Sequence, residues 1–426
     1  MKAHPLLIAA LIAAAQAPLA WADPVMEELQ ALRAQVQQLA GTVEQLQTTV
    51  TAQQERIRSL ESKPQQLAQQ PAPPQSRSVP IGLQAMNPEI GVVADIVGQA
   101  SESSQDGEGN DKFSARELEL VFGHPIDPYS RLDATIAFSD FEEPSLEEAY
   151  ITHWGLPAEV KARLGRLRPK IGKAAAMHRD SLDTVDEPLV VTRYLGAEGL
   201  SRTAMEFSSF LPLPWTSVTH EIAAGMMEGG VGEGATLFGE TRRRPSYYAH
   251  LKNFWDISDE TNVELGGTYL LGSSDADAHA EVNAFGADAT LVHFFTPTQK
   301  FKWQSELYVQ NRDEHLEVSV DPSSGEETTT IFEKNPWGVY SLLDFRLSPR
   351  FGLGGRFDYV EPVNLDPATI ARDGDTAWAS YLTFYQSEFT RWRLQYKHTD
   401  FAQGGDDDTV FVQGTVAIGV HKHALQ

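Results

Sequence analysis

Charged side chains recur at every second position in several segments of the first half of the chain. Glu117 and Glu119 are separated by one apolar residue, as are Arg131 and Asp133. In an extended chain such residues point to the same face. Acids on one strand opposite bases on another could set up an electric field across a water-filled passage, or they could pair and keep a wall hydrated. The candidates for this role are Glu117, Glu119, Arg131, Asp133, Glu148, Arg163, Arg166, Arg168 and Lys173.

Several basic candidates lie in the segment VKARLGRLRPK, residues 160–170. Arg163 falls in one register of the alternation, whereas Arg166 and Arg168 fall in the other. A β-bulge at Gly165 would shift the face and bring these side chains together. We therefore expect all three arginines to point to the same, inward face.

A second group of residues could bind a metal ion. His178, Asp180 and Asp183 lie in one polar segment and have side chains suited to zinc, and His421 and His423 form a further pair. One histidine among the acids of a loop favours a solvated loop over a metal site. The pair at 421 and 423 would supply an incomplete site.

The sequence argues against an enzyme and against a nucleic-acid partner. A hydrolase needs a nucleophile beside a base, and the histidines are scattered without such a partner. There is no cysteine, which excludes disulfides, thiolate metal sites and cysteine nucleophiles. The net charge of −25 is opposite in sign to the basic surface that a nucleic-acid-binding protein needs. We expect no cofactor, and zinc only as a transported ion.

The first 22 residues have the pattern of an export signal. Lys2 and His4 precede an apolar run from Leu6 to Ala17, and Ala20-Trp21-Ala22 is a small-residue cleavage site. The run is shorter than the roughly 20 residues that a membrane-spanning helix needs. With no other run of that length and a mean hydropathy of −0.31, a helical membrane protein is excluded. We expect cleavage after Ala22.

Residues 23–62 are predicted to form an α-helical coiled coil. Apolar residues recur at spacings of three and four, which is the heptad pattern of a helix that packs against copies of itself. The a positions are Leu29, Val36, Val43, Val50 and Ile57, and the d positions are Leu32, Leu39, Leu46, Gln53 and Leu60. Valine at a with leucine at d favours a dimer over a trimer. A single amphipathic helix is the alternative. The Gln- and Pro-rich residues 63–86 are expected to be an extended linker.

Residues 87–426 are predicted to form an all-β transmembrane barrel of about sixteen antiparallel strands. Long strands with period-two alternation include Val160–Ile171 and Arg391–Phe401. Tight turns such as Glu388–Thr390 alternate with long polar loops such as Arg312–Lys334, which is the arrangement of outer-membrane barrels, with the short side periplasmic. The long segment Gly172–Arg202 is expected to fold into the barrel and narrow it.

The segment 165–214 resembles that of outer-membrane proteins labelled zinc-regulated, TonB-dependent receptor-like barrels. Shared features are Gly172-Lys173, the histidine at 178, then DEPLV from Asp186 and LGAEGL from Leu195. The broader similarity is to phosphate-selective-type porins and covers most of residues 87–423. TonB-dependent receptors carry a plug and a TonB box, for which residues 23–80 have no room. The resemblance therefore implies a porin.

These features together predict a porin-like channel for small ions or solutes in the outer membrane of a Gram-negative bacterium, with a link to zinc uptake as an extension. Its partners would be outer-membrane lipid and copies of itself, as a dimer or trimer through a periplasmic coiled coil. Two alternatives stay open. One is a receptor barrel for a metal chelate or siderophore, and the other is a structural envelope tether.

Overall fold

The computed structural model describes residues 88–102, 111–140, 143–196, 199–214, 217–229, 236–239, 244–276, 279–320, 327–363 and 371–419. The predicted signal segment, coiled coil and linker, together with His421 and His423, lie outside the described residues. Within the described part, no helix is long and apolar enough to cross a membrane.

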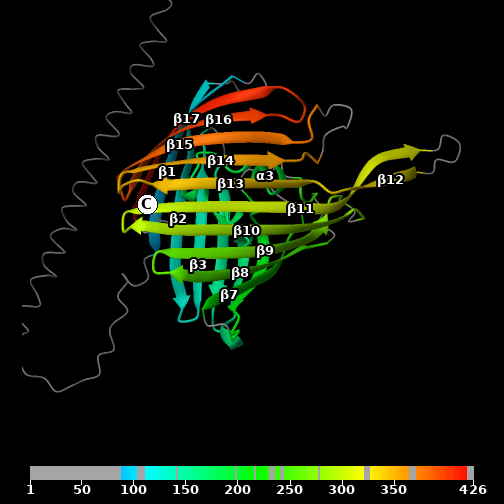
Figure 1. Cartoon of the computed structure of the whole chain (residues 1–426). Coiled ribbons are helices and arrows are strands. Elements are labelled where there is room, and N and C mark those ends of the chain that lie inside the picture. Colours follow the sequence, from blue (N-terminus) through cyan, green and yellow to red (C-terminus); the bar gives the residue numbers. More distant parts are fainter. Residues whose placement is uncertain are drawn as a thin grey trace, which may run out of the picture. The chain divides into compact units, whose positions relative to one another are not determined.

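The described residues form a closed antiparallel β-barrel (Figure 1). Each strand pairs with the next one in sequence except that β13 pairs with β11 instead of β12, and β1 pairs with both β2 and β17, which closes the ring. The strands are β1 Glu89–Ser101, β2 Asp111–Asp127, β3 Ser130–Phe138, β4 Ser145–His153, β5 Lys161–Leu167, β6 Arg202–Phe210, β7 Val218–Met227, β8 Ser246–Ser258, β9 Thr261–Ser273, β10 Glu281–Thr296, β11 Gln299–Val320, β12 Glu327–Lys334, β13 Trp337–Arg346, β14 Phe351–Val360, β15 Asp375–Ser387, β16 Thr390–Asp400 and β17 Asp406–Gly419. Sixteen of them form the wall, which confirms the predicted barrel.

The remaining strand, β12, belongs to a hairpin rather than to the wall. The first half of β11 pairs with β13, and beyond Arg312 β11 continues and pairs with β12. The segment Arg312–Lys334, expected to be a long polar loop, therefore contains two paired strands. The sequence of β12, ETTTIFEK, is rich in β-branched residues, which favour the extended backbone.

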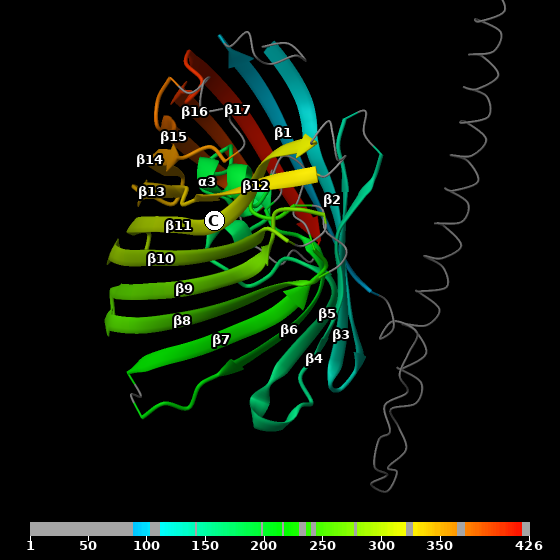
Figure 2. The ribbon, with the colours of Figure 1, turned by 90° about the vertical axis from the view of Figure 1, so that its right-hand side faces the viewer.

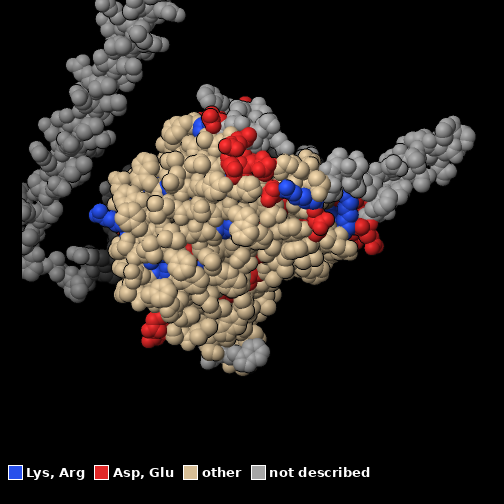
Figure 3. Space-filling view, turned by 45° about the horizontal axis from the view of Figure 1, so that its top comes forward, with Lys and Arg blue, Asp and Glu red and all other residues tan. Residues whose placement is uncertain are grey.

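The wall is apolar outside and polar inside, as the alternation predicted. On β16, Trp392 and Leu394 are about half exposed, whereas Arg391, Arg393 and Gln395 are buried. On the face seen in Figure 3 the wall is mostly uncharged, and acidic side chains gather towards the end from which β11 and β12 extend. A surface with this many exposed large apolar side chains fits contact with lipid tails rather than with water.

Register shifts occur in several strand pairs, and none lies at the expected glycine. Two of them place residues that contact the inner side of the barrel. The β1–β2 register shifts at Arg116, and the β3–β4 register shifts at Glu147. A bulge brings two consecutive residues to one face, and here Arg116 and Glu147 both make contacts inside the barrel. The pairings of β5 run through Gly165 without a shift. The bulge expected at Gly165 is therefore wrong.

The described residues between β5 and β6, 168–196 and 199–201, lie inside the barrel (Figure 2). We call the segment 168–201 the inner loop. It contains the 3-10 turns η4 (Ala174–Ala176) and η5 (Arg179–Ser181) and the short helix α3 (Leu189–Tyr194). A further 3-10 turn, η3 (Pro157–Glu159), connects β4 and β5. Strand β5 ends at Leu167 rather than at the expected Ile171, because Pro169 has no N–H for a sheet hydrogen bond.

Apolar side chains of the inner loop fill part of the barrel. Leu182, Val190 and Leu195 are buried in one cluster with Tyr340 and Leu342 of the wall. Glycine makes the close approach possible at β13, since a Cβ at Gly338 would lie 2.7 Å from Cγ2 of Val190. The expectation that this segment folds inward and narrows the barrel is confirmed.

Candidate functional site

Acidic side chains of the inner loop bind basic side chains of the wall on one side. Lys302 Nζ lies 2.6 Å from Asp183, and Arg356 and Lys397 lie 2.9 Å and 2.8 Å from the same oxygen of Asp186. Burial alone would raise the pKa of both aspartates. The neighbouring cations lower it by more, so both pKa values lie below the usual range. These ion pairs fix the loop to β11, β14 and β16.

The arginines of β16 bind the loop through its backbone. Arg391 donates to the carbonyl oxygen of Asp180 at 2.5 Å, and Arg393 donates to that of Thr184 at 2.9 Å. The side-chain oxygen of Gln395 accepts from the backbone N–H of Val185 at 2.7 Å. Inward polar side chains therefore satisfy loop groups that would otherwise be buried without a partner.

On the opposite side, basic groups of the loop meet acids of β4. His178 Nδ1 lies 3.1 Å from Glu147 Oε2, and His178 Nε2 lies 3.1 Å from Glu148 Oε2. Arg168 reaches Glu147 at 3.3 Å. Burial and Arg168 lower the pKa of His178, but hydrogen bonds to the surrounding glutamates outweigh them and hold this pKa well above 6.5. The inner loop thus connects an acidic side of the barrel wall, at β4, with a basic side, at β11, β14 and β16.

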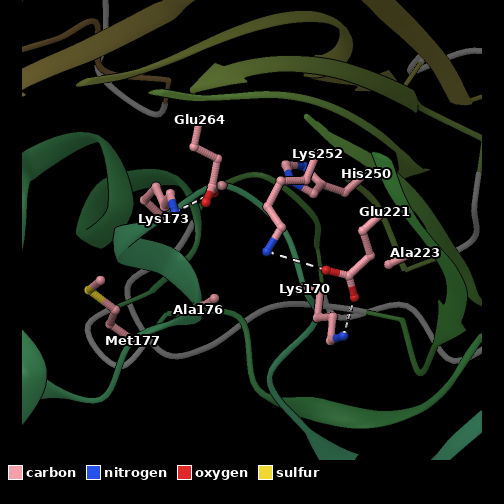
Figure 4. A pocket seen from close by; sticks show the side chains of 10 residues that line it. Lys170, Lys173, Ala176, Met177, Glu221, Ala223, His250, Lys252 and Glu264 are labelled. Carbon is pink, nitrogen blue, oxygen red and sulfur yellow. Dashed lines mark hydrogen bonds and ion pairs between the residues drawn. The ribbon is translucent and has the colours of Figure 1, made fainter. Parts of the chain in front are cut away.

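A cavity of about 250 Å³ remains between the inner loop and β7, β8 and β9 (Figure 4). Lys170 and Lys252 reach the two oxygens of Glu221 at 2.6 Å and 3.3 Å. Lys173 binds Glu264. The full lining is Lys170, Gly172, Lys173, Ala176, Met177, Glu221, Ala223, His250, Lys252 and Glu264. We call the five charged residues of this lining the Lys/Glu constriction.

The structure separates the charged residues that the sequence singled out. Glu117, Glu119, Asp133, Glu148 and Arg168 are buried on the inner side.

Arg131 pairs with Asp133 at 2.9 Å, and Arg163 pairs with Glu206 at 2.7 Å. Lys173 is the member of the predicted set that lines the cavity.

One of these residues faces the wrong way for its expected role. Leu164 is exposed and Leu167 is buried, so the alternation places Arg166 on the outer face with Leu164. Its guanidinium donates to the backbone oxygen of Glu147 at 3.3 Å. The expectation that Arg166 points into the barrel fails because Gly165 carries no bulge.

Sequence reasoning missed Glu221, Lys252 and Glu264. Each occupies an inward position of an alternating strand, and that signal was visible in β7, β8 and β9. What the sequence could not show is which part of the barrel the inner loop leaves open. That choice depends on ion pairs with strands more than a hundred residues away, such as Lys302–Asp183.

The proposed zinc residues are not brought together as expected. Among the described residues, the group whose ligand atoms all lie within 4.8 Å consists of Glu119, Glu147 and His178. Asp183 instead pairs with Lys302, and an oxygen of Asp180 accepts from the hydroxyl of Ser181 at 3.2 Å.

Comparisons with known proteins establish the fold. No family model matches the chain. An uncharacterised protein of Aquifex aeolicus is 27% identical over 312 residues, which are 68% of this chain and 64% of that protein. The chain thus spans slightly less than two thirds of its relative.

Two solved structures resemble the barrel over 78% of this chain. One is the outer membrane channel DcaP of Acinetobacter baumannii, with 12% identity, 98% coverage of that chain and a TM-score of 0.50. The other is a Salmonella typhi OmpF complex with daunomycin, with 9% identity, 97% coverage and a TM-score of 0.50. The chain has the fold of an outer-membrane porin-type barrel.

Proposed function

We propose that this protein is a porin-like channel of a Gram-negative outer membrane that passes small ions and polar solutes. The closed barrel satisfies its backbone groups within the wall, and its outer face is apolar. Barrels of sixteen strands are wide enough to hold an aqueous channel. The resemblance to a solved outer membrane channel supports the same function.

The Lys/Glu constriction is the observation that carries this proposal. We propose that this cavity, beside a loop that is fixed on both sides, is part of the route that ions take past the packed apolar cluster. Its three lysines and two glutamates give a formal charge of +1. In a narrow and partly dehydrated opening, a few fixed charges dominate ion passage because the effective dielectric falls below that of water.

Reversing charge at the constriction is expected to change ion selectivity. Lys252→Glu should shift the reversal potential in a salt gradient towards cations, and Lys173→Glu together with Lys252→Glu should shift it further. The residues singled out from sequence alone, Arg166 and Arg168, are unsuitable for this test. One faces outward and the other is held by Glu147.

The matched control is Arg350→Glu, which makes the same change of charge in the turn between β13 and β14, where the side chain is exposed. Its reversal potential should stay at the wild-type value. Equal shifts for Arg350→Glu and Lys252→Glu would show that selectivity is set by overall charge, and would remove the constriction from the proposal.

We also propose that the chain forms a homo-oligomer through residues 23–62. The apolar a/d positions of that segment need a partner helix. Val43→Lys with Leu46→Lys would place charges in this interface, at a cost of several kcal/mol. We expect cross-linking to show fewer oligomers while the barrel stays folded. An unchanged oligomer would mean that the barrel walls hold the copies together.

A further inference from the structure

Five ionisable side chains crowd together where the inner loop meets β2 and β4. Glu117 and Glu119 come from β2, Glu147 and Glu148 from β4, and His178 from the loop. All are between 2% and 6% exposed. The bulge at Glu147 is the local cause, because it brings two consecutive glutamates to the inner face. We call this group the Glu–His cluster.

The Glu–His cluster contains more negative charge than its surroundings neutralise. Four carboxylates face one imidazole and the Arg168 guanidinium, which lies 3.3 Å from Glu147. Arg179 also lies near Glu117 but pairs with Glu187, 3.7 Å away. Even with the imidazole protonated, the formal charge of these eight groups is −2. Buried charge of this kind is costly unless it is paired, protonated or bound to a metal ion.

Three carboxylate oxygens in the cluster lack a hydrogen bond. Oε2 of Glu117, Oε1 of Glu119 and Oε1 of Glu147 are shielded from solvent and have no hydrogen-bond partner in the described part of the chain. Oxygens buried in this way call for a bound proton or cation. The ligand atoms of Glu119, Glu147 and His178 all lie within 4.8 Å of one another, a separation that one metal ion can span.

We propose that Glu119, Glu147 and His178 bind a divalent transition-metal cation that ties the inner loop to β2 and β4. One imidazole nitrogen with carboxylate oxygens suits Zn²⁺ or Mn²⁺ better than Ca²⁺, which prefers oxygen ligands alone. His178 Nδ1 faces Glu119 and Glu147 at 3.4 Å and 3.1 Å.

The surroundings of His178 fit the role of a metal ligand. When Nδ1 binds the cation, Nε2 keeps its hydrogen and donates it to Glu148, 3.1 Å away. A carboxylate that accepts from the second nitrogen orients a histidine ligand and raises its basicity. The guanidinium of Arg168 donates to Glu147 Oε2 at 3.3 Å and so holds this carboxylate in place.

The test is direct measurement of bound metal in the full-length protein in detergent. After chelator treatment, the protein is dialysed against Zn²⁺ or Mn²⁺ and the metal is counted by mass spectrometry. Glu119→Gln and His178→Gln should each bind one ion per chain fewer than the wild type. His220→Gln, which removes a buried histidine that bonds Asn253 on β7 and β8, should bind as many as the wild type.

Thermal unfolding supplies a second reading that does not depend on metal bound elsewhere. Zn²⁺ or Mn²⁺ should raise the midpoint of the wild type and of His220→Gln more than that of Glu119→Gln, because only a folded site gains from the ion. Equal metal counts and equal shifts in all variants would overturn the proposal and leave shared protons as the partners of these oxygens. Neither measurement depends on conductance. A failed test of the proposed channel would therefore leave the metal site standing, and a failed test of the metal site would leave the channel standing.

Discussion

Replacing the inner loop, residues 168–201, by a short Asn-Gly turn is expected to raise single-channel conductance several-fold. Leu167 and Arg202 are register partners on β5 and β6, so a tight hairpin turn can join them without moving either strand. The deletion removes the apolar cluster that fills part of the barrel. Ionic current then passes through the width of the lumen rather than through the cavity beside the loop.

The control for this deletion is a similar replacement of residues 313–333 in the β11–β12 hairpin. Arg312 and Lys334 are also register partners, and the removed strands lie outside the paired wall. This variant should conduct like the wild type. If both replacements leave the current unchanged, the inner loop does not limit the passage of ions.

Arg356→Ala is expected to destabilise the protein far more than removal of an exposed arginine. The Arg356 side chain is fully buried, lies 2.7 Å from Asp358 and 2.9 Å from Asp186, and also donates to the backbone of Glu187. Removing one partner of a buried ion pair typically costs about 3–5 kcal/mol, because the other charge is left buried and unpaired. Here Asp358 loses its cation, and Asp186 keeps only Lys397 as a cationic partner.

Arg372→Ala provides the comparison, because Arg372 pairs with Asp400 where the two side chains are 48% and 35% exposed. Exposed pairs contribute about 0–1 kcal/mol. Chemical unfolding followed by tryptophan fluorescence should therefore separate the two variants clearly. Adding Asp358→Asn to Arg356→Ala should recover part of the loss, since it removes the charge that Arg356→Ala leaves unpaired. Equal unfolding curves for Arg356→Ala and Arg372→Ala would mean that Arg356 does not hold the loop.

The wall of the barrel could be predicted from the sequence because its signal is local. Alternation within one strand is enough to assign Trp392 to the outer face and Arg393 to the inner face, and both assignments are confirmed. The inward fold of the inner loop could be predicted for the same reason, because its length and its density of charge are also visible in one stretch of sequence.

The pairing of charges could not be predicted, because it depends on contacts between distant segments. Asp186 meets Arg356 and Lys397 only after the chain has closed into a ring. The bulges that build the Glu–His cluster have no glycine to mark them, whereas Gly165 suggested a bulge that is not present. Arg166 was therefore assigned to the wrong face, and Lys252 and Glu264 were missed.

The most direct test of the proposed channel is the current through a planar bilayer that contains the purified wild-type protein. The cavity beside the inner loop predicts discrete conductance steps in potassium chloride, with a reversal potential in a salt gradient that moves towards cations in Lys252→Glu. A folded wild-type barrel that inserts into the bilayer and gives no steps would contradict the channel.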